Sequence, residues 1–373
     1  MDNNTEKDTD VILEVKDLKT YFKTGPHKVV KAVEGVNFSL RKGKVLGIIG
    51  ESGSGKSVTA RSILRIVESP GYIAGGEIRF KGQDILKLPE KEMKSIRGNE
   101  ISMIFQEPMT SLNPIIRCGK QIAESLRLHR GMKKKEAMEE AIKMMQAVGI
   151  ANPQARAYEY PHQMSGGMRQ RVMIAMAMSS NPKVLIADEP TTALDVTIQA
   201  QILHLLLELQ KKNNMSIILI THDLELALKT ADKIVVFYAG TAVEEADTVD
   251  FNREAALRHP YTRALFRAMP EHGFAPEPGI QPYVRDLPEG CPYGPRCPKY
   301  KTECSKEVSY VPYQGGLVRC ICPGDENEIL PGILSGPAGL KGQMTSEQIT
   351  SEQMASGQRS GEYNAWGKEG VSL

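Results

Sequence analysis

The stretch that decides the fold reads Gly50-Glu51-Ser52-Gly53-Ser54-Gly55-Lys56-Ser57. It follows the apolar residues 45–49, which predict a buried strand, and precedes residues 58–67, whose apolar spacing predicts a helix. Glycines let a backbone curve closely around an anion, so that its amides and the positive end of the next helix face that anion. A lysine then reaches the outer phosphates of a nucleotide, and a serine hydroxyl suits Mg²⁺. The pattern predicts a nucleoside triphosphate site, because a plain Gly/Ser linker needs neither Lys56 nor Ser57.

Length and composition exclude several other classes of protein. The chain has 373 residues, of which 41% are hydrophobic and 25% charged, as in globular proteins of two or three domains. A net charge of +2 gives no reason to expect a nucleic-acid partner. The longest apolar runs, such as residues 217–220, are too short to cross a bilayer, and the polar N-terminus lacks a signal-peptide core. We expect a soluble, cytoplasmic chain that meets a membrane only through partners.

Composition also divides the chain into parts. Residues 11–255 alternate apolar strands with amphipathic helices, as in an α/β fold. Residues 256–325 are irregular, rich in proline and hold five of the six cysteines. Residues 1–10 are polar, and residues 326–373 have too little apolar surface to offset the entropy of ordering. We predict one α/β domain, a small cysteine-rich C-terminal domain and two disordered ends.

Two further predicted strands end in side chains suited to phosphate chemistry. Residues 184–187 lead into Asp188 and Glu189, and residues 216–221 lead into His222. An acid at a strand end beside a phosphate loop organises Mg²⁺, and a second carboxylate there can act as a general base on water. A histidine at the next strand end can reach a γ-phosphate. Chance acidic pairs and structural histidines are common, but these three share one place in the strand order. We predict Asp188 as a Mg²⁺ residue and Glu189 and His222 as catalytic residues.

A second glycine-containing helix start reads Met164-Ser165-Gly166-Gly167-Met168-Arg169-Gln170. The apolar helix 172–179 follows, so its N-terminus can also accept an anion. Because one phosphate loop already serves the nucleotide of this chain, the second helix start predicts contact with a nucleotide held by another subunit.

Six motifs in this order resemble the ATPase subunit of an ATP-binding cassette (ABC) transporter. They are the phosphate loop as Walker A, Gln106 after strand 101–105 as the Q-loop, Ser165-Gly166-Gly167 as the signature, Asp188-Glu189 as Walker B with the catalytic glutamate, residues 193–195 with Asp195 as the D-loop, and His222 as the switch histidine. The resemblance covers residues 11 to about 255. It implies a P-loop α/β core of the RecA type, an antiparallel β subdomain and an α-helical subdomain at about residues 107–165.

The same resemblance implies the ligands and their residues. ATP and Mg²⁺ are the implied cofactors, with Ser57, Gln106 and Asp188 around the metal ion. An aromatic ring stacks on adenine in this family, and Phe22 fits that position best, with Tyr21 second. The implied nucleotide contacts are residues 50–57, Val58, Gln106, Ser165, Gly166, Gly167, Gln170 and Asp195.

Finer features resemble the dipeptide, oligopeptide and nickel importers. Met164 and Met168 replace the usual leucine and glutamine of the signature, and residues 106–114 and 259–262 are similar to that branch. The resemblance implies peptide cargo, with nickel, glutathione, opines or oligosaccharides as alternatives. A soluble ABC ATPase without a transport role is disfavoured by the single phosphate loop and the absence of sustained heptads between residues 106 and 165.

The resemblance also implies an assembly. It includes a second, related ABC ATPase subunit, two transmembrane permease subunits that contact residues 106–163, and an extracellular or periplasmic substrate-binding protein. The chain would then lie at the cytoplasmic face of the cell membrane.

Five cysteines cluster near the C-terminus, at positions 291, 297, 304, 320 and 322. Their flanks make a poor core, and disulfides are unfavourable in a reducing cytoplasm. Zinc suits four thiolates, although no paired Cys-x₂-Cys occurs here. The run resembles the C-terminal extension of dipeptide and oligopeptide importer ATPases, whose four cysteines are associated with a [4Fe–4S] cluster. That resemblance implies the ligands Cys291, Cys297, Cys304 and Cys320, with Cys322 spare and Cys118 an ordinary buried thiol.

Overall fold

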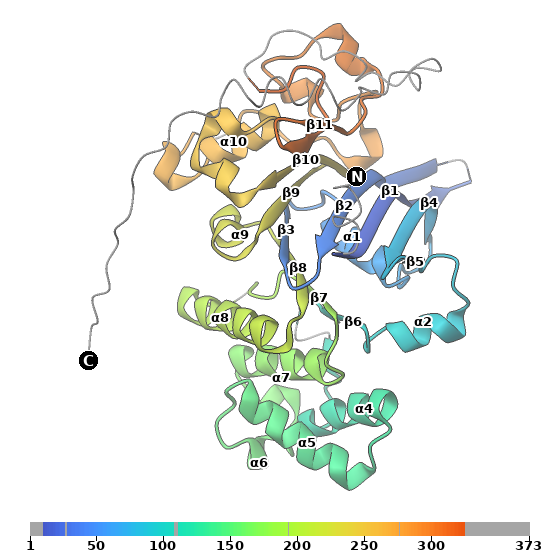
Figure 1. Cartoon of the computed structure of the whole chain (residues 1–373), viewed down its shortest axis with the longest axis vertical. Coiled ribbons are helices and arrows are strands. Elements are labelled where there is room, and N and C mark those ends of the chain that lie inside the picture. Colours follow the sequence, from blue (N-terminus) through green and yellow to red (C-terminus); the bar gives the residue numbers. More distant parts are fainter. Residues whose placement is uncertain (1–9, 27, 108–110, 193, 276, 325–373) are drawn as a thin grey trace, which may run out of the picture.

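The computed structural model describes residues 10–26, 28–107, 111–192, 194–275 and 277–324 (Figure 1). Its largest sheet has eight strands in the order β11-β12-β10-β9-β3-β8-β7-β6. The strands are β3 (Val45–Gly50), β6 (Ile101–Ile104), β7 (Val184–Asp188), β8 (Ser216–Thr221), β9 (Lys233–Tyr238), β10 (Thr241–Asp247), β11 (Val311–Tyr313) and β12 (Gly316–Val318). The predicted ends, residues 1–10 and 326–373, lie outside the described residues except for residue 10.

The phosphate-loop strand β3 lies inside the parallel part of this sheet, with a parallel neighbour on each side. It pairs in parallel with β8 on one side and β9 on the other, and β7 and β6 continue the parallel order. All residues of β3, β7 and β8 are buried, as expected for parallel strands covered on both faces. Because these strands run in one direction, their carboxyl ends meet at one edge of the sheet, where Gly50, Asp188 and His222 lie.

A second, antiparallel sheet lies beside the first (Figure 1). Its strands, in the order β2-β1-β4-β5, are β1 (Val11–Gly25), β2 (Lys28–Arg41), β4 (Gly71–Phe80) and β5 (Gln83–Asp84). One hydrophobic core joins the two sheets, since Leu13 and Phe38 of the second sheet belong to the same buried cluster as Leu46 and Ile48 of β3. The structure thus has the α/β core that the sequence pattern predicts and the antiparallel β part that the resemblance implies.

The helices occupy distinct regions of the chain. They are α1 (Lys56–Ile63), α2 (Glu90–Ile96), α4 (Cys118–Arg130), α5 (Lys134–Ala147), α6 (Pro153–Arg156), α7 (Gly166–Met178), α8 (Val196–Asn213), α9 (Leu224–Thr230) and α10 (Pro260–Arg267). α1 ends before the predicted position 67, because Arg65 takes a left-handed φ of 54°. In the parts of the chain that the structure describes, every helix is too short or too polar to span a membrane.

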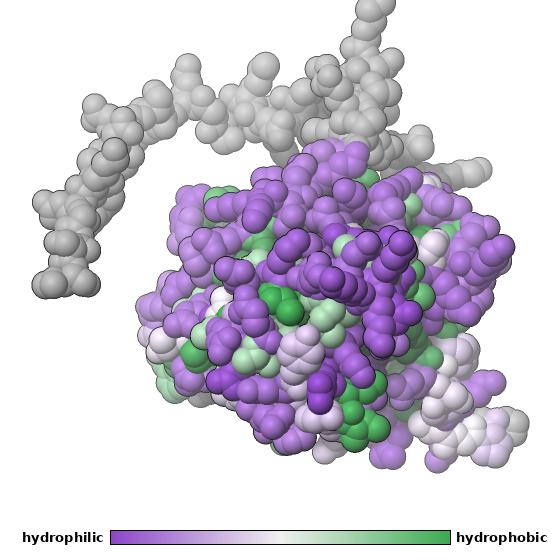
Figure 2. All heavy atoms as spheres, turned by 90° about the horizontal axis from the view of Figure 1, so that it is seen from below, coloured by the Kyte–Doolittle hydropathy of each residue, from purple (hydrophilic) through white to green (hydrophobic). Residues whose placement is uncertain are grey.

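Helices α4–α6 form one end of the molecule, within the predicted range 107–165 (Figure 1). They pack on α7 through a core that includes Ile122, Leu126, Ala141 and Met145. Figure 2 shows the molecule from this end: hydrophilic residues cover most of the surface, and hydrophobic residues form small, separate areas.

Residues 256–324, called the C-terminal extension below, form the opposite end of the molecule (Figure 1). The extension contains α10, several short 3₁₀ turns and the hairpin β11–β12. Strand β12 pairs with β10, so the extension completes the eight-stranded sheet of the α/β core. The predicted division at residue 255 therefore does not coincide with a break in the sheet.

A buried arginine joins this hairpin to the core. Arg258 is 2% exposed, and its guanidinium lies 3.2 Å from Glu244 of β10 and 2.8 Å from Asp250. It also donates to the backbone carbonyls of Tyr313 and Gln314 at the tip of the hairpin. One side chain thus connects three segments that are far apart in the sequence.

Candidate nucleotide site and the residues around it

The phosphate loop, residues 50–57, fits tightly between two strands. A Cβ on Gly55 would lie 2.5 Å from the carbonyl oxygen of Ala32, and one on Gly50 would lie 2.3 Å from that of Phe237. Gly55 also has a φ of 96°, in the region that side chains disfavour. These two positions therefore require glycine, and the loop connects buried β3 to α1 through a narrow, fixed path.

Lys56 lies under this loop rather than in solvent. It is 4% exposed, and its Nζ donates hydrogen bonds to the carbonyls of Gly50 at 2.7 Å and Glu51 at 2.9 Å. Burial lowers the pKa of Lys56, and the nearby carboxylates of Glu189 and Asp188 oppose that shift. The ammonium is therefore held at the loop, where it can meet the charge of a phosphate group.

The predicted Mg²⁺ residues Ser57 and Asp188 are in direct contact. Ser57 Oγ donates to Asp188 Oδ1 at 3.0 Å. Asp188 is 2% exposed, and burial raises its pKa to about 6, while the hydrogen bond from Ser57 opposes this. A buried carboxylate beside a hydroxyl is a donor set that suits a hard cation. The residues thus fit Mg²⁺ in chemical type.

The Glu189 carboxylate contacts several other side chains of the site. Its Oε2 accepts hydrogen bonds from Gln106 Nε2 at 2.9 Å and Thr192 Oγ1 at 3.0 Å, and it lies 3.4 Å from His222 Nδ1. The backbone of Glu189 has a φ of 45°, a position in which strain often accompanies function. The structure thus brings together three residues that the sequence placed on separate strand ends. The sequence did not predict the contact of Thr192, which lies three residues after Glu189.

The signature lies on a different part of the molecule from the phosphate loop. Ser165 is exposed and caps α7, accepting a hydrogen bond from Met168 N at 3.3 Å. Figure 1 shows α7 beside α4–α6 and α1 beside the antiparallel sheet. Gln170 is 1% exposed inside α7, and its role at a second nucleotide stays a prediction.

The D-loop lies next to the signature in the folded chain. A Cβ on Gly166 would lie 3.6 Å from Leu194 Cδ2, and one on Gly167 would lie 3.1 Å from Ile198 Cγ2. Asp195 caps α8 by accepting from Ile198 N at 3.0 Å. Residue 193 lies outside the described residues, so the motif is described only in part.

The two candidate adenine residues differ in their surroundings. Tyr21 donates to Glu34 Oε2 at 2.7 Å and meets Tyr72 edge-on. Phe22 is half-buried, with its Cε1 atom 2.6 Å from where a Cβ on Gly71 would lie. Val58 is likewise half-buried and packs against the core that joins the sheets. The role of Phe22 at adenine stays a prediction.

Glu51 has contacts that the sequence did not predict. Its Oε1 accepts a hydrogen bond from Tyr261 OH at 3.2 Å and lies 3.2 Å from Arg296 Nη1. Both donors belong to the C-terminal extension, 210 and 245 residues away along the chain. No short-range pattern could have indicated these contacts.

The five clustered cysteines surround one small cavity of about 20 Å³. Besides the five thiols, it is lined by residues that include His259 and Lys299. Burial raises the pKa of Cys291 to about 12 and that of Cys297 to about 11. Among the residues that the structure describes, no three His, Cys, Asp or Glu side chains form a group that could hold a metal ion. The predicted cluster ligands therefore converge without forming a metal site.

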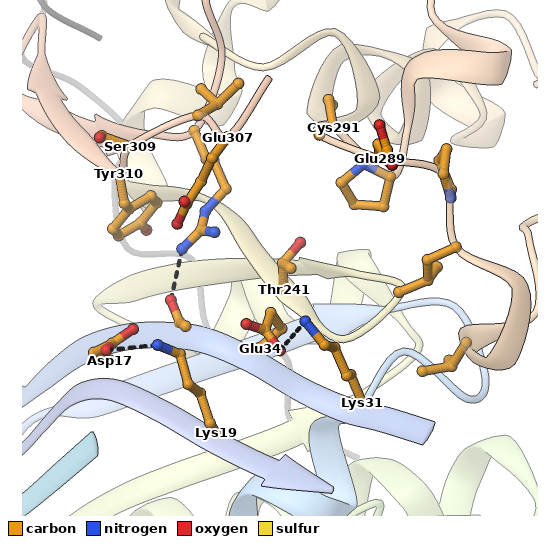
Figure 3. Close-up of a pocket in the computed structure, with 18 of the residues that line it drawn as sticks. Asp17, Lys19, Lys31, Glu34, Thr241, Glu289, Cys291, Glu307, Ser309 and Tyr310 are labelled. Atoms are coloured by element: carbon orange, nitrogen blue, oxygen red, sulfur yellow. Dashed lines mark hydrogen bonds and ion pairs between the residues drawn. The ribbon is translucent and has the colours of Figure 1, made fainter. Parts of the chain in front are cut away.

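A larger cavity of about 860 Å³ separates the antiparallel sheet from the extension. Figure 3 shows Lys19 and Lys31 of β1 and β2 opposite Glu307 and Tyr310 of the extension. Both lysines are paired, with Asp17 and Glu34. None of the predicted nucleotide residues lines this cavity. Cys291 lines both this cavity and the cysteine cavity.

The phosphate loop, the contact of Ser57 with buried Asp188 and the Glu189 hydrogen bonds define a P-loop ATPase built as an ATP-binding cassette. Family models agree with this class: one described as "ABC transporter" matches residues 33–192, and one described as "Oligopeptide/dipeptide transporter, C-terminal region" matches residues 243–304.

Similar proteins extend the match over most of the chain. The dipeptide transport ATP-binding protein DppD of Escherichia coli is 50% identical over 74% of this chain and 86% of its own length. The oligopeptide transport ATP-binding protein OppD of the same organism is 47% identical over 86% and 96%. The dimeric cassette MJ0796 bound to ADP and phosphate has a TM-score of 0.57 at 27% identity, covering 63% of this chain and 98% of that one. The chain belongs to the ABC transporter ATP-binding subunits of the dipeptide and oligopeptide branch, and it is an ATPase.

Proposed function

We propose that the chain hydrolyses ATP to drive the import of dipeptides or oligopeptides through a membrane ABC transporter. The observation that carries the ATPase role is the single sheet edge at which Lys56, Asp188, Glu189 and His222 meet. The peptide cargo is supported by relatives that are named dipeptide and oligopeptide transport ATP-binding proteins and by the match of residues 243–304.

Each residue at this edge has a chemical task. The amides of the phosphate loop and Lys56 would bind the β- and γ-phosphates, while Ser57, Gln106 and Asp188 would hold Mg²⁺. The metal ion, when bound, neutralises charge that develops on those phosphates. Glu189 takes a proton from the attacking water, and His222 donates toward the γ-phosphate. The exposed imidazole of His222 and the hydrogen bond from Gln106 both orient the Glu189 carboxylate.

A second ABC ATPase subunit completes the site. Ser165, Gly166 and Gly167 start α7 on the helical side of the molecule, apart from the phosphate loop (Figure 1). This helix start can accept an anion but does not reach the nucleotide on the phosphate loop of the same chain. It is therefore suited to contact a nucleotide that is bound to a facing subunit. The similar cassette MJ0796 is described as a dimer. We propose that the facing subunit is a related but different chain.

The remaining partners are two permease subunits and a substrate-binding protein outside the membrane. Residues 106–163 supply the permease contact, and Gln106 connects that contact to the catalytic base through its 2.9 Å hydrogen bond to Glu189. The chain then sits peripherally on the cytoplasmic face of the membrane, and residues 11–255 act as the cassette with residues 256–325 as its branch-specific extension.

The cysteine cavity is proposed to receive a [4Fe–4S] cluster on Cys291, Cys297, Cys304 and Cys320, with zinc as the alternative. Five thiols that line one cavity support this. Burial raises the pKa of Cys291, Cys297 and Cys320, and backbone amides that donate to these three sulfur atoms oppose the rise. A cavity of about 20 Å³ accepts little more than one water, so the thiols must move apart to admit a cluster. Anaerobic purification followed by assays of iron, sulfide and zinc tests the proposal. One zinc per chain without iron would exclude the cluster.

Uptake by cells tests the transport role. A strain that lacks this chain is complemented with the wild type or with Lys56→Ala, and the uptake of a labelled dipeptide, a labelled pentapeptide and nickel is measured. We expect the wild type alone to restore peptide uptake. Restoration of nickel uptake without peptide uptake would overturn the cargo assignment and leave the ATPase role intact.

A further inference from the structure

Glu51 connects the phosphate loop to the C-terminal extension. Its backbone carbonyl accepts from Lys56 Nζ at 2.9 Å and from Ser54 N at 3.2 Å, so its main chain is part of the phosphate-binding path. Its carboxylate points the other way, toward Tyr261 OH and Arg296 Nη1, each 3.2 Å from Oε1. A single residue is therefore held from both sides.

Arg296 is itself fixed in place. Its side chain is 8% exposed, its Nε donates to the Pro278 carbonyl at 3.0 Å, and its Nη1 contacts Tyr238 OH at 3.3 Å. The guanidinium carbon lies 5.9 Å from the centre of the Tyr238 ring. Tyr238 packs in turn against Tyr261 and Tyr293. An arginine held by two neighbours presents a rigid donor to Glu51, unlike a mobile surface side chain.

We propose that Arg296, assisted by Tyr261, positions the phosphate loop for ATP through Glu51. Because glycine-rich loops lose much conformational freedom when they order around a ligand, an anchor at the second residue of the loop lowers the entropic cost of binding ATP. Arg296 is thus a positioning residue, since it contacts none of the reacting groups. This rests on the proposed role of residues 50–57 in binding ATP.

The arrangement also couples the cysteine cavity to the nucleotide site. Arg296 directly precedes Cys297, which lines the cavity, and Gly294 and Cys297 close the same short turn through a 3.1 Å backbone hydrogen bond. Any change that shifts this turn also shifts the Arg296 guanidinium, which donates to the Glu51 carboxylate.

Titration of the full-length chain with a fluorescent ATP analogue tests the proposal. Arg296→Ala should weaken binding about tenfold or more, the scale of a hydrogen bond to a charged group. Lys299→Ala is the matched control: Lys299 also neighbours the cavity, but its Nζ bonds to the Gly324 carbonyl within the extension. The control should bind the analogue like the wild type.

A double-variant cycle separates positioning from general destabilisation. In a Glu51→Ala background, Arg296→Ala should cause no further loss of affinity, because its target is gone. Equal losses in both backgrounds, or unchanged affinity in the single variant, would overturn the proposal. If the phosphate loop did not bind ATP at all, Lys56→Ala would leave analogue binding unchanged, and the proposed function would fail instead.

Discussion

The nucleotide edge and the C-terminal extension are built by different means. At the edge, each functional residue lies at or shortly after the end of a strand: Lys56 and Ser57 follow β3 after the phosphate loop, Asp188 ends β7 and His222 follows β8. In the extension, short turns are held by side chains that reach distant segments, as Arg258 does toward Glu244, Asp250 and the hairpin. Parallel strand order alone assembles the first region, whereas the second depends on a few buried polar contacts.

Of the substitutions that test this contrast, Arg258→Met should have the largest effect. Removing the guanidinium leaves Glu244 buried without its cation, and breaking a buried pair costs about 3–5 kcal/mol. We expect the free energy of unfolding in urea to fall by that amount. Arg285→Met is the control, because Arg285 is exposed and pairs with exposed Asp286, so its effect should stay within about 0.5 kcal/mol. Similar losses in both variants would mean that the extension does not depend on long-range polar contacts.

Glu189→Gln tests the nucleotide edge, the other of the two regions. Turnover in the assembled transporter should fall about 10²-fold or more, since a general base is lost, while ATP binding and the urea midpoint stay unchanged. ATPase assays and analogue titration measure the two quantities. Glu225→Gln, an exposed change on α9, should leave both as in the wild type. Normal turnover with Glu189→Gln would contradict the assignment of the base.

The smallest of the expected effects is on how the free energy of unfolding depends on pH. Burial lowers the pKa of His259 from 6.5 to about 3. Between these values the unfolded chain binds a proton that the folded chain does not, so the free energy of unfolding falls as the pH falls, by up to about 1.4 kcal/mol per pH unit. His259→Asn keeps a helix-capping side chain and should reduce this slope between pH 6.5 and 5.

Urea unfolding at several pH values measures that slope. Burial raises the pKa of Glu244, which accepts from His259 N, but this carboxyl is present in both proteins and contributes equally. His204→Asn, at an exposed site on α8, is the control and should keep the wild-type slope. An unchanged slope in His259→Asn would show that other groups set the acid sensitivity.

The same contrast explains what the sequence could predict. The strand–loop–helix order around residues 50–57 and the acids after β7 are short-range signals, so fold and catalytic edge follow from the pattern. The contact of Glu51 with Tyr261 and Arg296 and the pairing of β12 with β10 depend on chain segments that meet only after folding. The burial of Gln170 could not be predicted either, because a helical motif does not reveal which of its faces is buried.

The pairing of β12 with β10 has a consequence for how the protein is made. A ribosome releases β10 long before residues 316–318, so the newly made sheet has an unpaired strand at its border until almost the whole described chain has emerged. Unpaired strand borders attract other chains. A chain shortened before residue 311 would keep that border open permanently. Such a fragment should associate with itself even though its phosphate loop and both catalytic residues are intact.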